Sequence, residues 1–374
     1  MTTSDLDIHV DACRGRQRRV LEFMRRQQLD LVVVTQTEHV QYLAGPRFWW
    51  AFQPAAALNA DGKLTLVAPN KEPDVAAADN VVTYQAQKHS TLRNDQRQAS
   101  SEVLAGVLAG RKYQRIGVEF SSFGVPLAHS FGAAQLVDIE PALYELRRRK
   151  DPDELARLRK AIAGTGRMYA RAREIIRPGI SELDVFNELQ AVAVTEFGEM
   201  LQGSGSGTGN DYQCCSRGGP PRAGHVAQAG ELFILDLGPA FRGYFADNCR
   251  AIAVTEADAR QHEACAHIQR VLAHVERTVK PGKSCRELYD EACAILKQAA
   301  VGVFDHHLGH GIGLFPHEAP HLNPNWDDVF QEGEVFTAEP GLYAPELRAG
   351  IRLENDYLVT NGGVELLSDF PLGL

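Results

Sequence analysis

Five side chains of the kinds that bind metal ions are spaced through the C-terminal part of the sequence. They are Asp236, Asp247, His310, Glu339 and Glu354. Four carboxylates near one point repel one another strongly unless protons or cations neutralise them. A pair of divalent cations would neutralise them and would also activate water at neutral pH. The residues therefore suggest a dinuclear hydrolytic site, provided that the fold brings them together.

Asp236 and Asp247 lie on two segments that we expect to form a hairpin. LFILDLG (232–238) is typical of a buried strand, and YFADNCRAIAV (244–254) is its expected partner. A turn centred between Phe241 and Arg242 would place Asp236 directly opposite Asp247. Directly opposed residues have Cβ atoms roughly 4.5–5.5 Å apart, which is close enough to share a metal ion.

A second hairpin would bring Glu339 and Glu354 together in the same way. VFTAEPG (335–341) and GIRLENDYLV (350–359) flank a turn whose expected centre makes these two glutamates face each other. Each like-charge pair would destabilise its sheet without a cation. His310 lies among glycines in HHLGHGIG (306–313), where the backbone can approach closely and an imidazole offers a neutral nitrogen ligand.

The elements around these residues occur twice in the sequence. IRPGISELDVFNEL, from residue 176, resembles VKPGKSCRELYDEA, from residue 279. The same offset relates Asp236 to Glu339, and GSGSGTGN (203–210) to HHLGHGIG. Each half is predicted to contain two helices and a hairpin. If two such halves pack together, we expect a curved antiparallel sheet with helices outside it, and a functional site near the pseudo-twofold axis between the halves.

We expect two domains. Residues 1–148 are typical of a smaller α/β domain, in which a helix over 16–30 leads into a strand at 31–35 and a hairpin turns at Asp61-Gly62. Asp151-Pro152 is expected to open a helix that runs through Ile176 and begins the second domain, residues 149–374. The fold class expected for the whole chain is α+β.

Composition narrows the expected partners. The net charge is −9, and the one basic cluster, residues 147–150, lies at the expected linker, so nucleic acid is not expected as a partner. No segment is typical of a membrane span or a signal peptide. The seven cysteines form no CxxC pattern, which fits a reducing compartment. We therefore expect a cytoplasmic protein without a membrane partner.

The C-terminal segments together resemble the pita-bread metallohydrolases, which include aminopeptidase P, prolidase, methionine aminopeptidase and the metal-free creatinase. The similar segments are DLG (236–238), YFADNCR (244–250), HHLGHGIG, PHE (316–318), TAEPG (337–341) and RLE (352–354). The N-terminal segments resemble the small domain of prolidases, aminopeptidases P and creatinases. Methionine aminopeptidases usually lack that domain, so the resemblance favours the proline-directed branch.

The resemblance also implies roles for individual residues. Asp236 would bind one metal ion, Asp247 and Glu354 would bridge two, and His310 and Glu339 would complete the second. Glu339 would also transfer a proton during catalysis. Three more residues match side chains that contact the substrate or support the site: His306, His317 and Arg352. His307 and His321 are expected to be surface or packing residues.

The implied activity is hydrolysis of Xaa-Pro amide bonds by a metal-bound hydroxide, of the aminopeptidase P or the prolidase type. The implied cofactors are two divalent metal ions. A site rich in oxygen ligands favours Mn(II), and Co, Fe or Zn are alternatives. The substrate would be a peptide or small amide, and a homodimer is expected. One segment of the small domain has two possible roles: it packs as a loop against the catalytic domain, or it reaches the substrate of a neighbouring subunit. It consists of Arg47, Phe48, Trp49 and Trp50.

The sequence departs from the family pattern ahead of Asp236. Peptidases of this family usually carry another histidine there. The position where that histidine is expected, five residues after Asn210, is occupied by Cys215, and His225 is the only histidine nearby. This departure favours an alternative, a metal-dependent hydrolase or lyase of a small non-peptide metabolite. A non-catalytic binding homologue is less favoured, because all five ligands are retained. Cys249, where threonine is common, is either an inert side chain or an oxidation-sensitive thiol.

Overall fold

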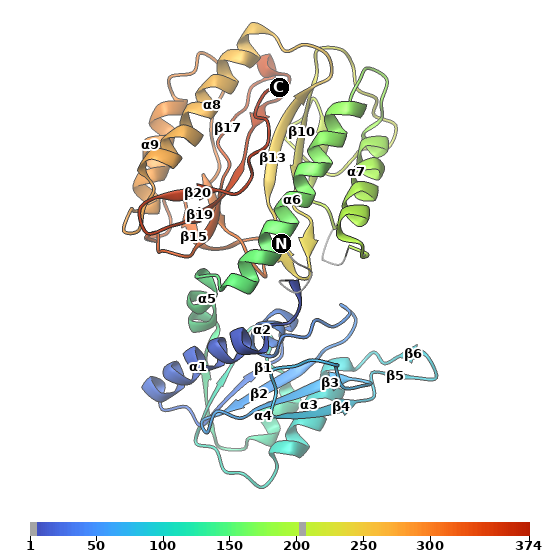
Figure 1. Cartoon of the computed structure of the whole chain (residues 1–374), viewed down its shortest axis with the longest axis vertical. Helices are drawn as coiled ribbons and strands as arrows, with labels where there is room; N and C mark the ends of the chain where they lie inside the picture. The colour runs from blue at the N-terminus through green and yellow to red at the C-terminus, as the bar shows by residue number, and fades with distance from the viewer. Residues whose placement is uncertain (1–5, 202–206) are drawn as a thin grey trace. The chain divides into compact units, whose positions relative to one another are not determined.

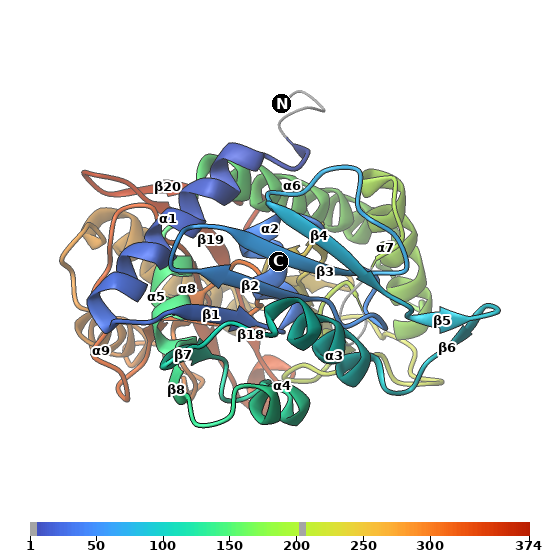
Figure 2. The same ribbon diagram turned by 90° about the horizontal axis from the view of Figure 1, so that it is seen from below.

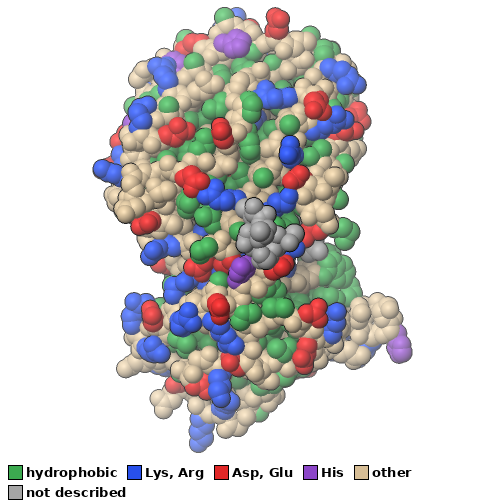
Figure 3. Space-filling view, in the orientation of Figure 1, with side chains coloured by type: hydrophobic (Ala, Val, Ile, Leu, Met, Phe, Trp, Pro, Cys, Tyr) green, Lys and Arg blue, Asp and Glu red, His purple; other side chains and the backbone are tan. Residues whose placement is uncertain are grey.

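The computed structural model describes residues 6–201 and 207–374 (Figure 1). The chain divides into two compact units, Met1–Arg147 and Arg148–Leu374. The predicted match of residues 203–210 to 306–313 includes residues 203–206, which lie outside the described ranges. No helix in the described ranges is both long enough and apolar enough to cross a membrane. Basic and acidic side chains are interspersed over the face shown in Figure 3.

The first unit is a sheet with helices on both faces. The strands lie in the order β4-β3-β2-β1-β7-β8. Figures 1 and 2 show α1 and α2 on one face and α3 and α4 on the other. The elements are α1 Val10–Gln27, β1 Leu31–Val34, α2 Thr37–Ala44, β2 Ala55–Asn59, β3 Leu64–Pro69, β4 Asn80–Tyr84, β5 Gln87–Lys88, β6 Thr91–Leu92, α3 Gln96–Leu108, β7 Arg115–Val118, α4 Val125–Ser130, β8 Gln135–Asp138 and α5 Glu140–Arg148.

Two sequence predictions for this unit can be compared with the structure. The hairpin of β2 and β3 is confirmed, and Gly62 supplies the positive φ of 89° that its turn needs. The first helix begins earlier than predicted, at Val10 rather than residue 16. It ends at Gln27 because Gln28 adopts a left-handed conformation, with φ 54°.

The second unit contains two helix pairs, each packed on its own antiparallel sheet (Figure 1). Its elements are α6 Pro152–Ile175, α7 Glu182–Phe197, β9 Asp211–Cys214, β10 Leu232–Leu237, β11 Ala240–Phe241, β12 Tyr244–Phe245, β13 Asn248–Ala253, α8 Ala259–Thr278, α9 Cys285–Leu296, β14 Gly309–Gly311, β15 Glu318–Leu322, β16 Val335–Ala338, β17 Gly341–Leu342, η2 Pro345–Leu347, β18 Ile351–Arg352, β19 Asn355–Val359 and β20 Val364–Leu366.

The predicted duplication is visible in this unit. Ser181 caps α7 by accepting a hydrogen bond from the Asp184 amide, and Ser284 caps α9 in the same way. Each serine also forms an isolated β-bridge, to Val226 and Val329 respectively. Asp151 opens α6 with a capping box, as the sequence predicts, so equivalent local signals fix the helix pair of each half.

The hydrophobic cores follow the same division. One cluster joins α6 and α7 to the sheet β13-β10-β9, and the other joins α8 and α9 to the sheet β15-β14-β16-β19-β20. The two halves meet where the Glu354 amide donates a hydrogen bond to the Cys249 carbonyl over 2.9 Å. This junction puts the end of β13 beside the segment that carries Glu354.

Candidate active site

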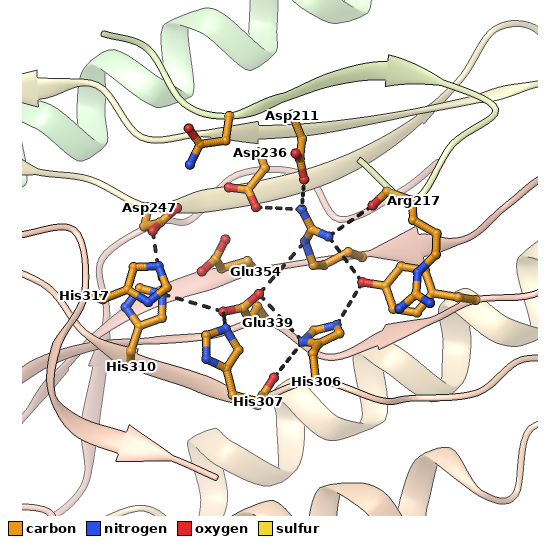
Figure 4. A pocket seen from close by; sticks show the side chains of 13 residues that line it. Asp211, Arg217, Asp236, Asp247, His306, His307, His310, His317, Glu339 and Glu354 are labelled. Carbon is orange, nitrogen blue, oxygen red and sulfur yellow. Dashed lines mark hydrogen bonds and ion pairs between the residues drawn. The ribbon is translucent and has the colours of Figure 1, made fainter. Parts of the chain in front are cut away.

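All five predicted metal ligands line one cavity of about 350 Å³ in the second unit. Figure 4 shows Asp236 and Asp247 on one side of it, His307 and His310 on the other, and Glu339 and Glu354 between them. The described residues that line it are Asn210, Asp211, Arg217, Asp236, Asp247, His306, His307, His310, His317, Glu339, Tyr343, Arg352 and Glu354. The predicted substrate-contacting residues are therefore also in the cavity.

The hairpin that carries Asp236 and Asp247 has a different register from the predicted one. Asp236 pairs with Cys249, not with Asp247. The turn consists of Arg242 and Gly243, which have φ values of 48° and 88°, so its centre is one residue later than expected. This moves the pairing by two positions, which preserves the face of every side chain. Asp247 remains a diagonal neighbour of Asp236 on that face.

The second hairpin has the predicted register. Ala338 pairs with Asn355, and Gly341 pairs with Arg352. Glu339 and Glu354 lie between these two pairs and therefore oppose each other. The turn between these strands is longer than that of the first hairpin and contains the 3-10 helix η2, but its centre agrees with the prediction.

His310 enters the cavity from β14. A side chain at the preceding Gly309 would collide with the carbonyl of Thr337, so glycine is required for β14 to approach β16. Nε2 of His310 lies 3.7 Å from Asp247 and 3.6 Å from Glu339. Its ring stacks on His317, with centroids 3.7 Å apart. The histidine therefore closes the ring of carboxylates on the side opposite Asp236.

The ligand atoms fall into two overlapping sets. Asp236, Asp247 and Glu354 form one, and His310, Glu339 and Glu354 form the other, with the ligand atoms of each set within 4.8 Å of one another. Both Glu354 carboxylate oxygens are buried and have no hydrogen-bond partner among the residues that the structure describes. A buried carboxylate without partners is costly unless a cation binds it. The donor set of this cavity thus fits two divalent ions that share Glu354.

Burial dominates the electrostatics of these groups. It raises the pKa of Asp236 to about 6 and raises the pKa values of Asp247 and Glu354 well above the usual range. The neighbouring carboxylates add to these shifts. Burial lowers the pKa of His310 to about 3, so this imidazole is neutral and able to bind a metal. Without cations, the cavity favours the protonated forms of Asp236, Asp247 and Glu354.

Arg352 is a buried cation beside the carboxylates. Its Nη2 donates hydrogen bonds to Asp211 and, over 2.7 Å, to Asp236. Its Nη1 donates to the Tyr343 hydroxyl over 3.2 Å and to the Arg217 carbonyl over 3.3 Å. This arginine therefore orients Asp236 from behind and ties β18 to the segment that follows β9.

Two adjacent histidines lie on the remaining wall. His306 interacts through Nε2 with the Tyr343 hydroxyl over 2.8 Å. His307 approaches Glu339, with Nε2 2.7 Å from Oε1. The expectation that His307 is a surface or packing residue was therefore wrong. His321 lies outside the cavity, where it interacts with Asp328 and stacks on Trp326.

Comparison with known proteins agrees with this arrangement. The family model "Metallopeptidase family M24" matches residues 156–361, which is more than half of the chain. This chain belongs to metallopeptidase family M24. A second model, "Creatinase/Prolidase N-terminal domain", matches residues 16–149. The predicted family and two-domain fold are thereby confirmed, and family membership implies divalent metal ions in this site.

Individual M24 proteins are similar over much of the chain. The putative dipeptidase YkvY of Bacillus subtilis is 31% identical over 256 residues, which cover 66% of this chain and 68% of that protein. The Pyrococcus furiosus prolidase structure has a TM-score of 0.78 at 23% identity, covering 94% of this chain and 99% of that one. The Pyrococcus horikoshii prolidase structure has a TM-score of 0.80 at 22% identity, covering 96% and 99%. These two structures share the fold.

The segment where the sequence departs from the M24 pattern places two candidate residues outside the cavity. Cys215 follows β9 with a positive φ of 52° and is absent from the cavity lining. His225 is also absent from it and lies 3.7 Å from the buried Glu182. The residues of this segment that do reach the cavity are Asp211 and Arg217. No histidine from 211–225 therefore lines the M24 site.

Four further lining residues were not predicted: Asn210, Asp211, Arg217 and Tyr343. Asp211 is paired with Asp236 across β9 and β10, and the strand pattern of residues 211–214 is too short to be recognised in the sequence. Tyr343 had a usable signal, because it follows the TAEPG motif by two residues. Arg217 had none, because it lies in an irregular segment.

Proposed function

We propose that this M24 protein is a metal-dependent peptidase that hydrolyses Xaa-Pro amide bonds. The observation that carries the proposal is the pair of ligand sets that share Glu354 inside one cavity. The similar proteins bear names such as putative dipeptidase, prolidase and Xaa-Pro dipeptidase, which supports a peptide substrate. Asp236, Asp247, His310, Glu339 and Glu354 would hold the two ions.

The bound ions would supply Lewis acidity and lower the pKa of water. The protein side chains would transfer the proton and would orient the substrate and the metal ligands. Glu339 would accept a proton from water and pass it to the leaving nitrogen, with His307 holding its carboxylate in place. His306 and His317 would face the substrate carbonyl, and their lowered pKa values, caused first by burial, keep them neutral. Arg352 would orient Asp236.

An Xaa-Pro panel tests the proposal. Chelator-stripped protein should hydrolyse Xaa-Pro dipeptides or tripeptides only after a divalent cation is restored. Mn(II) is the cation we expect to work best, because oxygen ligands outnumber the single imidazole. Protein with measured metal content that cleaves none of the panel would refute the proposal. A homodimer and a cytoplasmic location remain predictions from the sequence.

One observation favours a second candidate, a hydrolase or lyase of a small non-peptide amide or related metabolite. The segment 211–225 contributes an aspartate and an arginine to the cavity and no histidine. The lining from segment 211–225 differs from the family pattern, but the five metal ligands are retained. This combination is expected if the substrate differs from that of the peptidases and the metal chemistry is the same. Metal-loaded protein that is inactive on peptides but active on small amides would support this alternative.

A further inference from the structure

Two arginines, Arg217 and Arg352, are among the described residues that line the cavity. The Arg352 side chain is only 10% exposed, its two terminal nitrogens donate to Asp211, Asp236 and Tyr343, and its Nε lies 4.0 Å from Glu339. The imidazole of His307 is paired with the same glutamate. The Arg217 side chain is 53% exposed. A substrate anion that entered this cavity would therefore meet Arg217 as the more exposed of its two arginines.

The segment that carries Arg217 is fastened on both sides. The Arg217 carbonyl accepts a hydrogen bond from Arg352 over 3.3 Å. The Gly219 amide donates to the Asp211 carboxylate over 2.6 Å, and Gly218, with φ 140°, leaves room for that carboxylate where a side chain would collide with it. A backbone held in this way presents its side chain from a fixed point, which binding sites require.

The guanidinium itself is held loosely enough to change partners. It lies over the Tyr343 ring, 4.1 Å from the ring centroid. Its other contact is an ion pair with Asp305, whose side chain is 49% exposed. Ion pairs at such exposure contribute little stability. A substrate carboxylate can therefore replace Asp305 at small cost, while the aromatic ring keeps the guanidinium in place.

We propose that Arg217 binds the free α-carboxylate of the substrate and so makes Xaa-Pro dipeptides the preferred substrates. The proposal rests on the proposed Xaa-Pro hydrolysis and adds which peptides are used. Arginine matches a carboxylate through two parallel N–H donors, which gives both affinity and orientation. The cavity of about 350 Å³ suits a small substrate, because ligand pockets span roughly 300–1,000 Å³.

The test compares Leu-Pro with Leu-Pro-amide, which lacks the carboxylate charge. Metal-loaded wild-type protein should hydrolyse Leu-Pro with a kcat/KM about tenfold or more above that for the amide, as expected for a charged hydrogen bond. Arg217→Ala should abolish this preference by raising KM for Leu-Pro much more than KM for the amide. Arg217→Lys should restore part of it, because it keeps the charge and loses the planar fork.

Arg159→Ala is the matched control, because Arg159 forms an exposed ion pair with Glu365 away from the cavity. It should keep the wild-type preference. Equal hydrolysis of acid and amide by wild-type protein, or an unchanged preference in Arg217→Ala, would overturn the role of Arg217 and leave Xaa-Pro hydrolysis standing. Failure of loaded wild-type protein to cleave either compound would overturn the proposed function and this inference together.

Discussion

Nε2 of His307 lies 2.7 Å from Oε1 of Glu339. Burial opposes ionisation of Glu339, but the hydrogen bond and positive charge of His307 outweigh it, and together with the charge of Arg352 they lower the pKa of Glu339 to about 2. Burial likewise opposes protonation of His307, but Glu339 prevails and raises its pKa. The two side chains therefore stabilise each other in the charged forms, and His307 fixes the orientation of the carboxylate proposed to transfer the proton.

Replacing His307 tests that relationship. We expect His307→Ala to lower kcat/KM by about tenfold or more, since hydrogen bonds to charged groups contribute roughly 1.5–3 kcal/mol. His307→Gln should recover part of the loss, because its amide group can still donate a hydrogen bond. Steady-state kinetics on the best Xaa-Pro substrate, at saturating metal, would measure both effects. Wild-type kinetics in His307→Ala would show that Glu339 does not depend on this neighbour.

Glu339→Gln tests the proposed acid–base role more directly. The substitution keeps the shape of the side chain and removes its charge and its capacity to accept a proton. We expect kcat to fall by about 10²–10⁴-fold, the range typical for loss of a general acid–base group. Circular dichroism and the melting temperature should stay close to wild type. A variant that is folded, metal-loaded and still fully active would refute the mechanism.

Metal binding and pH should be coupled in a defined direction. Burial raises the pKa of Asp236 from 3.8 to about 6. A carboxyl group whose pKa is raised by folding loses its stabilising contribution as pH rises, here between about 4 and 6, by about 3 kcal/mol. Asp247 and Glu354 act in the same direction. The metal-free protein should therefore become less stable across this interval.

Divalent cations should offset that loss, because they bind the deprotonated carboxylates. The increase in melting temperature on adding Mn(II) should consequently be larger at about pH 7.5 than at about pH 5. Glu354→Gln, which removes the shared ligand charge, should stabilise the metal-free protein at the higher pH and weaken the metal effect. A Mn(II) shift of equal size at both pH values would contradict this coupling.

The sequence correctly predicted that the metal ligands lie close together. It did not correctly predict the strand register of the hairpin that carries Asp236 and Asp247. Short apolar segments typical of strands identified both hairpins, and the turn positions were inferred from the residues between them. The first inference failed because Arg242 and Gly243 both adopt positive φ and form a two-residue turn. The error was two residues, which kept Asp236 and Asp247 on one face. Because side chains alternate with a period of two residues, the prediction of the site was correct although the predicted register was wrong.

No comparable sequence pattern predicts the other residues that line the cavity. Arg217 and Asp211 are brought to it by an irregular segment, whose path depends on the contact of Gly219 with Asp211 and of Arg352 with the Arg217 carbonyl. Such contacts join residues far apart in the chain and leave no periodic pattern. His307 was misjudged for a related reason, since only the position of Glu339 on the facing segment shows that it has a partner there.

The histidine missing from segment 211–225 is not replaced by His225. This residue lies beside Glu182, which keeps its hydrogen bonds from the Arg222 side chain over 2.6 Å and from the Cys214 amide over 2.8 Å without it. We therefore expect His225→Ala to leave kcat and KM unchanged. His307→Ala, measured in parallel, provides the comparison with a histidine inside the cavity. A clear loss of kcat in His225→Ala alone would mean that this histidine reaches the substrate during turnover.

Cys249 should behave as an inert side chain rather than as a redox-sensitive thiol. It is fully buried opposite Asp236, and burial raises the pKa of its thiol well above the usual range. Only the thiolate reacts readily with alkylating agents and peroxide. Iodoacetamide should therefore leave Cys249 unmodified in the folded protein and modify the partly exposed Cys293 faster. Peptide mass spectrometry before and after denaturation would measure both sites. Alkylation of Cys249 in folded protein, accompanied by loss of turnover, would instead identify a thiol that controls the activity.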